Sequence, residues 1–138
     1  MLKVVLGPKG TGKTQRVIDL VNKAIDQELG SVVCIELGNR LTYDISHRAR
    51  LIDVTDYPMN GYEMLRGFVA GLCAGNYDIS YIFIDSLYKV SNDKDPAETS
   101  AFLEWLDKFS DEKQFKAAVM ISVPMEEATD VMKKYSMD

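Results

Sequence analysis

The chain has 138 residues, of which 46% are hydrophobic and 27% are charged, and its formal net charge is −5 at pH 7. This length fits one domain, residues 1–138, with an ordinary buried core, and the composition excludes a disordered or fibrous chain. The acidic balance argues against non-specific nucleic-acid binding, because no surplus of cations is available to neutralise phosphates. We therefore expect no nucleic-acid partner.

The sequence contains no recognisable signal peptide and no apolar run long enough to span a bilayer. Cys34 and Cys73 lie in apolar segments without Cys-x-x-Cys spacing, so we expect buried, reduced thiols. His47 is the single histidine and has no familiar metal-binding spacing with them. These features predict a cytoplasmic protein without membrane insertion.

Residues 7–14 match the complete pattern G-x-x-x-x-G-K-[ST] of a phosphate-binding loop. Apolar residues 2–6 predict a buried strand before the loop, and a 3.6-residue apolar period predicts a helix that begins near Lys13. Glycines allow the loop to curl around an anion, which the helix N-terminus also attracts. The alternative is a glycine-rich turn that binds nothing. We expect all eight residues to bind nucleotide phosphates: Gly7, Pro8, Lys9, Gly10, Thr11, Gly12, Lys13 and Thr14.

Two residues of this loop have specific expected roles. The Lys13 ammonium would reach the β- and γ-phosphates of a nucleotide, and the Thr14 hydroxyl would bind Mg²⁺.

Strands that alternate with helices follow along the rest of the chain. We expect strands at 31–36, 49–54, 79–85 and 117–123, and helices up to Gly30, at 61–74, from Pro96 onward and at 125–135. Gly30 is the expected left-handed stop, and Asn60 and Asp95 are the expected helix caps. The spacing of Gly67, Gly71 and Gly75 predicts close packing of a helix on the sheet. This pattern predicts an α/β fold, a three-layer α/β/α sandwich on a five-stranded, mainly parallel sheet.

Asp85 follows four apolar residues, 81–84, and would stand at the carboxyl end of its strand. Ligands of open α/β sheets bind at that edge, so Asp85 is the expected second metal residue beside Thr14. The alternative is an acid that only ends a strand at a turn.

Residues 82–87, Ile-Phe-Ile-Asp-Ser-Leu, resemble the Walker B strand of the RecA-like (ASCE) ATPases, with residues 7–14 as the Walker A loop. The resemblance covers most of residues 2–123 and implies the strand order 3-2-4-5-1. It also implies that Glu36, at the end of the second strand, is a catalytic residue that orients the attacking water or accepts its proton. Lys13 is the other expected catalytic residue, and Ser122 is expected to sense the γ-phosphate. The alternative for Glu36 is an exposed strand-end glutamate.

Other features narrow what the resemblance implies. RecA-type recombinases have further strands and DNA-binding loops after this core, so we expect no recombinase activity here. Residues 92–95 do not form the Asn-Lys-x-Asp guanine motif, so adenine is expected. Residues 39–47 are faintly similar to a segment of the thymidine kinases with a RecA-like core, but the sequence shows no cysteine-rich zinc-binding lasso. Pilus-retraction ATPases share the loop pattern Gly-Pro-x-Gly-x-Gly-Lys, but their acidic and histidine boxes are not found here. Arginine fingers in the family come from a neighbouring subunit, and the candidates here are Arg40, Arg48, Arg50 and Arg66.

The expected function is thus a Mg²⁺-dependent ATPase, a hydrolase of regulatory or assembly type with ATP and Mg²⁺ as cofactors. An unidentified protein partner or a homo-oligomer is compatible with this expectation. One alternative is a kinase whose nucleoside-like acceptor binds residues 37–48. Another is a partner subunit that ATP switches without hydrolysis.

Overall fold

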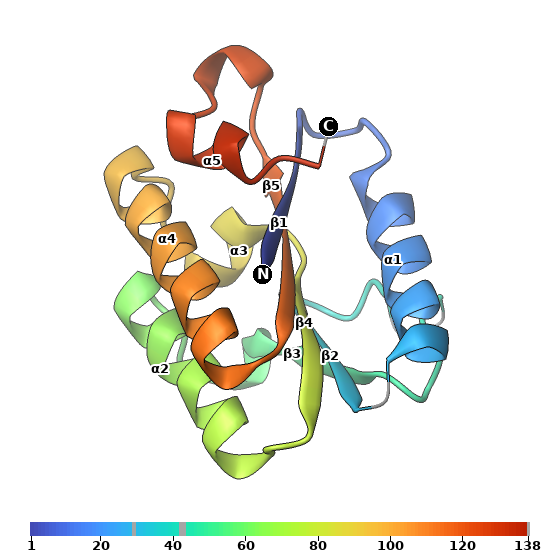
Figure 1. Cartoon of the computed structure of the whole chain (residues 1–138). Helices are drawn as coiled ribbons and strands as arrows, with labels where there is room; N and C mark the ends of the chain where they lie inside the picture. The colour runs from blue at the N-terminus through green and yellow to red at the C-terminus, as the bar shows by residue number, and fades with distance from the viewer. Residues whose placement is uncertain (29, 42–43, 138) are drawn as a thin grey trace.

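The computed structural model describes residues 1–28, 30–41 and 44–137 (Figure 1). All strand pairs of its single sheet are parallel, as the strand–helix alternation predicts. The strands are β1 (Leu2–Gly7), β2 (Ser31–Glu36), β3 (Arg50–Asp53), β4 (Ile79–Ile84) and β5 (Lys116–Ser122). Their order is β1-β5-β4-β2-β3. Counted from the β3 edge, this is the order 3-2-4-5-1 expected above.

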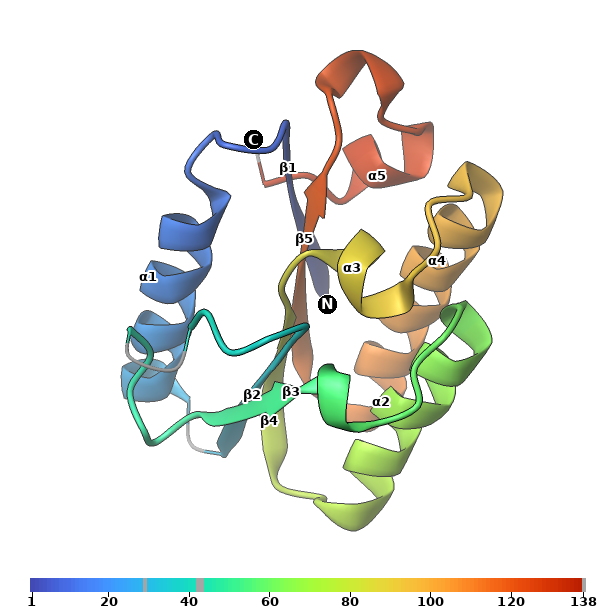
Figure 2. The ribbon, with the colours of Figure 1, turned by 180° about the vertical axis from the view of Figure 1, so that it is seen from behind.

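The helices lie on both faces of this sheet (Figures 1 and 2). The α-helices are α1 (Lys13–Gln27), α2 (Tyr62–Gly75), α3 (Leu87–Ser91), α4 (Pro96–Lys113) and α5 (Asp130–Lys134), and the 3₁₀ turns are η1 (Val54–Asp56) and η2 (Met125–Glu127). Helix α1 covers one face, whereas α2, α3 and α4 cover the other, so the chain forms three layers. None of the described helices is long and apolar enough to cross a membrane.

Two apolar clusters fill the spaces between these layers, because consecutive strand residues point to opposite faces. Val4 belongs to the cluster under α2 and α4, and its neighbour Val5 belongs to the cluster under α1. The α1 cluster also contains three buried residues of the segment that follows β2, namely Leu41, Ile45 and Ala49. Residues 37–41 and 44–49, called segment 37–49, therefore help α1 to cover its face of the sheet.

The helix ends agree with the expectations at α4 and differ at α2. The Asp95 carboxylate accepts a hydrogen bond from the Glu98 N–H at 2.9 Å, and Pro96 follows it as the first helical residue. Asn60 does not cap α2: Gly61 occupies the cap position without a side-chain hydrogen bond. The side-chain Oδ1 of Asn60 instead accepts a hydrogen bond from the side-chain amide of Asn92 at 3.1 Å.

The expected roles of four glycines are wrong. Gly30 does not have the positive φ of a left-handed helix stop, and α1 ends earlier, at Gln27. Gly67, Gly71 and Gly75 lie on the exposed side of α2, where an added Cβ would meet no atom within 4 Å. The glycine spacing in α2 therefore reflects no close contact with the sheet.

Two further expectations need correction. Residues 87–91 form the short helix α3, which the sequence pattern did not predict. The tail forms η2 and α5 rather than one helix, because Ala128 has an extended backbone and Thr129 caps α5 by accepting from the Met132 N–H. Met125, the first residue of the expected tail helix, is exposed.

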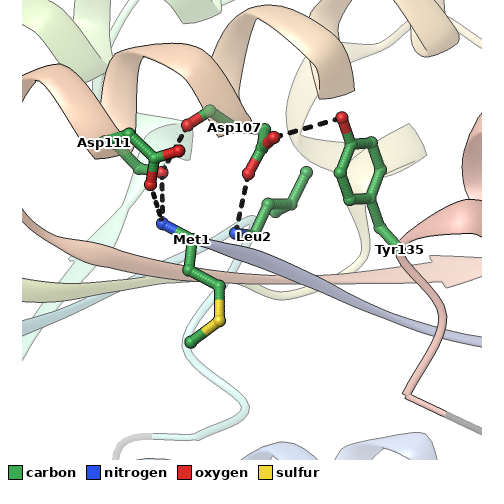
Figure 3. A network of polar contacts seen from close by, with 6 residues as sticks. Met1, Leu2, Asp107, Asp111 and Tyr135 are labelled. Atoms are coloured by element: carbon green, nitrogen blue, oxygen red, sulfur yellow. Dashed lines mark hydrogen bonds and ion pairs between the residues drawn. The ribbon is translucent and has the colours of Figure 1, made fainter.

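The outer edge of β1 is fastened to helix α4 and to the tail (Figure 3). The Met1 amino group contacts Asp111 at 2.7 Å, and the Leu2 N–H donates to the Asp107 carboxylate at 3.1 Å. The same carboxylate accepts from the Tyr135 hydroxyl at 3.3 Å. The Val4 backbone bonds to Tyr135 and Met137 on that edge. These contacts fix the strand that leads into the loop of residues 7–14.

Gly30 is needed for a close backbone contact, which gives a test of the fold. A Cβ at Gly30 would overlap the Asp78 carbonyl oxygen, to which the Ser31 N–H donates at 2.9 Å. We expect Gly30→Ala to lower the free energy of unfolding by about 1–3 kcal/mol in urea titrations. The control Gly71→Ala should raise it by about 0.5–1 kcal/mol, because that site is helical and open. Equal effects of the two changes would contradict this account.

Candidate functional site

The loop of residues 7–14, which carries the expected phosphate-binding motif, joins β1 to α1. Gly10 and Gly12 have φ angles of 85° and 83°, a left-handed conformation that favours glycine. Gly12 caps α1 without a side-chain hydrogen bond, and the first turn contains no acidic residue. The first N–H groups of a helix have no partner within it, so this end of α1 suits an anion.

Lys13 lies across the loop that precedes it. Its Nζ donates to the Pro8 carbonyl oxygen at 2.6 Å and to the Thr11 hydroxyl at 3.4 Å. The Thr11 hydroxyl donates to the same carbonyl at 2.7 Å. Partial burial lowers the pKa of Lys13, and the nearby Asp85 carboxylate counteracts this. The Lys13 ammonium is therefore held close to the N-terminal end of α1.

Asp85 stands directly after β4 and is 2% exposed. Its N–H donates to the Ile35 carbonyl oxygen of the neighbouring strand at 2.9 Å. Its Oδ2 lies 3.4 Å from an Nη of Arg40. Burial raises the pKa of Asp85, while the Arg40, Lys89 and Lys13 cations lower it. The carboxylate is thus buried beside cations and forms an ion pair with one of them, Arg40.

A cavity of about 480 Å³ is lined both by the loop of residues 7–14 and by Asp85. Its walls are Lys9, Gly10, Gly12, Lys13, Thr14, Arg40, Asp85, Ser86, Tyr88, Lys89, Lys94 and Ser122. Among these residues, five carry positive charge and only Asp85 carries negative charge. Ser122 pairs with Gly7 across the β1–β5 ladder, which brings the expected phosphate sensor to the start of the loop.

Glu36 ends β2 and is 1% exposed, so it is not an exposed strand-end glutamate. Among the described residues, none forms a hydrogen bond of good geometry with either carboxylate oxygen, although the Leu41 backbone N–H lies close enough to favour the charged form. Glu36 is not among the residues of the cavity wall. Burial raises the pKa of Glu36. The Leu41 backbone N–H and the Arg40 guanidinium counteract part of this rise, and the Asp85 carboxylate adds to it.

Asp53 is a residue of this edge that the sequence pattern did not identify. It pairs with Glu36 in the β2–β3 ladder. Its Oδ1 accepts hydrogen bonds from the Gly38 N–H at 2.7 Å and from the Thr55 N–H at 2.9 Å. Hydrogen bonding by the Thr55 hydroxyl, together with these two N–H groups, lowers the pKa of Asp53. Asp53 thereby ties the start of segment 37–49 to the end of β3. Its place as an acidic residue at the end of a strand is the sequence feature from which this role could have been predicted.

Of the four arginines considered as fingers, only Arg40 lies in the cavity wall. Arg48 pairs with Asp26 at 2.7 Å, and Arg50 donates to the Asn76 side chain at 2.8 Å, so both are engaged elsewhere. Lys89, Lys94 and Tyr88 of the cavity wall were also missed. All three follow Asp85 in the sequence. The two lysines there were the only feature from which a site for an anion could have been predicted.

Thr14 and Asp85 fit the coordination that Mg²⁺ prefers. This ion binds one or two protein oxygens and completes its shell with waters and phosphate oxygens. Both residues line the same cavity, and Asp85 supplies a buried carboxylate there. Within the described residues, no group of three or more His, Cys, Asp or Glu side chains could hold a metal alone. The donors therefore suit an ion that arrives with phosphate.

The two cysteines differ in burial. Cys34 is buried as expected, whereas Cys73 is half-buried. Burial raises the pKa of both thiols, which keeps them protonated and unreactive at neutral pH.

Neither a protein-family model nor a curated protein sequence matches the chain. The functional interpretation therefore depends on the loop motif and on the geometry of the cavity.

The burial of Glu36 predicts a pH-dependent effect on stability. Its folded pKa lies above the unfolded value of 4.5, so the folded state binds more protons between the two values and loses stability as pH rises. Glu36→Gln should raise the free energy of unfolding by about 1 kcal/mol at pH 7, because an amide costs less to bury than a carboxylate. The gain should shrink toward pH 4.5. Denaturant titrations at both pH values measure it, with the exposed Glu112→Gln as control. A gain that is independent of pH would refute this cause.

Proposed function

We propose that the protein binds ATP through residues 7–14 and hydrolyses it in a Mg²⁺-dependent reaction, as a RecA-like ATPase of regulatory or assembly type. The observation that carries this proposal is the cavity that Lys13 and Thr14 share with Asp85. A phosphate-binding loop and a strand-end carboxylate in the wall of one cavity are the two parts that such a reaction requires.

The charge of the cavity supports a polyphosphate ligand. The whole chain carries a net charge of −5, yet the wall of the cavity contains five cationic side chains and one carboxylate. A cleft of one sign attracts the opposite charge and raises its local concentration. The uncapped N-terminus of α1 adds backbone donors at the same place.

Each residue then has a defined part in the reaction. Lys13 and the α1 N–H groups hold the β- and γ-phosphates, and Thr14 and Asp85 would hold Mg²⁺, which when bound neutralises charge on the phosphate oxygens. The Glu36 carboxylate orients the attacking water or accepts its proton, for which its raised pKa is suited. Ser122, beside Gly7, donates to the terminal phosphate.

The burial of Glu36 favours one second candidate, an ATP-switched partner subunit with little hydrolysis. A carboxylate that is 1% exposed and lies outside the cavity wall reaches water only after a rearrangement. Isolated protein should therefore turn over slowly, and a partner that opens access to Glu36 should accelerate it. The two candidates share the binding site and differ in the rate of phosphate release.

Nucleotide binding is the first test. Lys13→Ala removes the ammonium beside the loop and should weaken ATP binding by about 10–100-fold, the loss expected for a charge-assisted contact. Isothermal titration calorimetry with ATP and Mg²⁺ measures the affinity, with GTP as the test of base preference. Lys108→Ala, on the exposed face of α4, is the control and should bind like the unchanged protein. Equal affinities of both variants would exclude the loop as the site.

Phosphate release separates hydrolysis from switching. Glu36→Gln should reduce release by at least about 100-fold while ATP affinity stays within about threefold, because the residue acts on water rather than on the nucleotide. If the unchanged protein binds ATP but releases no phosphate, the switch is the better account. If ADP forms only after a nucleoside-like acceptor is added, the protein is a kinase.

A further inference from the structure

This inference rests on the proposed function and names a specificity residue of the same site. We propose that Arg40 distinguishes a nucleoside triphosphate from a diphosphate, by exchanging its ion pair with Asp85 for the terminal phosphate of the bound nucleotide.

The ion pair between Arg40 and Asp85 has the geometry of a contact that exchanges easily. Its single close approach is 3.4 Å, whereas charge-assisted hydrogen bonds are about 2.7–2.9 Å long and arginine commonly forms two of them with a carboxylate. The Arg40 side chain is 48% exposed, but the Asp85 side chain is 3% exposed. The buried Asp85 carboxylate therefore holds the Arg40 guanidinium only weakly.

The same carboxylate is the expected metal residue of the site. A carboxylate that serves a divalent cation cannot keep a guanidinium equally close, since the two cations repel each other. Nucleotide binding with Mg²⁺ at Thr14 and Asp85 thus competes directly with Arg40.

The surroundings leave a displaced Arg40 with one type of partner. The other charged side chains of the cavity wall are cations: Lys9, Lys13, Lys89 and Lys94. Glu36 is close enough to interact electrostatically with Arg40, but it is buried behind the wall. A guanidinium that leaves Asp85 among like charges is stabilised if the ligand itself extends negative charge toward it. A terminal phosphate does this, and a diphosphate is one phosphate shorter.

The backbone on both sides of Arg40 is anchored, so the exchange requires only side-chain motion. On one side the Gly38 N–H is bound to Asp53, and on the other side Leu41 is fully buried in the cluster under α1. Further along the segment, Asn22 of α1 bonds to the backbone of Asp44 and Ser46. Arg40 thus acts within its own chain, unlike a finger from a neighbouring subunit.

Calorimetric affinities for a non-hydrolysable ATP analogue and for ADP, both with Mg²⁺, test the proposal. Arg40→Gln should weaken the triphosphate analogue by about 10–100-fold, because it removes a charge-assisted phosphate contact. ADP should bind as before or more tightly, since Asp85 no longer has a competing cation. Arg48→Gln is the matched control, because this exposed arginine of the same segment pairs with Asp26. It should change neither affinity.

The outcomes separate the two proposals. If the unchanged protein binds neither nucleotide, the proposed function is wrong. If it binds both, but Arg40→Gln weakens them equally or not at all, the role of Arg40 is wrong and the nucleotide site stands. If Arg40→Gln does not fold, Arg40→Lys is measured instead. It keeps the charge without the planar fork, so it should weaken the triphosphate alone, by about 3–10-fold, and equal losses for both ligands would overturn the role.

Discussion

The parallel pairing of the five strands is the constraint on which the candidate site depends. Because all strands point the same way, their carboxyl ends meet at one edge of the sheet. The register then decides which residues become neighbours there: Gly7 lies beside Ser122, and Glu36 lies beside Asp53. A chain with the same motifs but one antiparallel strand would send that strand's functional residue to the opposite edge.

This edge concentrates charges that the fold leaves incompletely paired. Asp85 and Glu36 are both buried, and Arg40 is the cation that interacts with both carboxylates. Burying a carboxylate without a partner opposes folding, so its presence needs a cause other than stability. An excess of cations around the cavity, next to two underpaired acids, suits a ligand that brings its own phosphates and metal.

Local patterns predicted the parts of this protein that local forces determine. The bounds of β2, the parallel sheet and the cap at Asp95 follow from apolar runs and from side chains close in sequence. Gly30 and Asn60 could not be predicted in this way, because their roles depend on Asp78 and Asn92, which are distant in sequence. The loop motif named Lys13 and Thr14 as candidate site residues, and the acid at a strand end named Asp85. That Arg40 lies beside Asp85 could not be predicted, because it depends on how segment 37–49 packs in three dimensions.

That path follows from an imbalance between the two faces of the sheet. One helix, α1, covers one face, while α2 and α4 with shorter elements cover the other. The face under α1 therefore needs further apolar cover, which Leu41, Ile45 and Ala49 supply. Burial of Leu41 holds the preceding residue, Arg40, at the edge where Asp85 ends its strand. The requirement to complete a core thus places a half-exposed cation beside a buried carboxylate, and it couples the packing of this segment to the residues of the cavity wall.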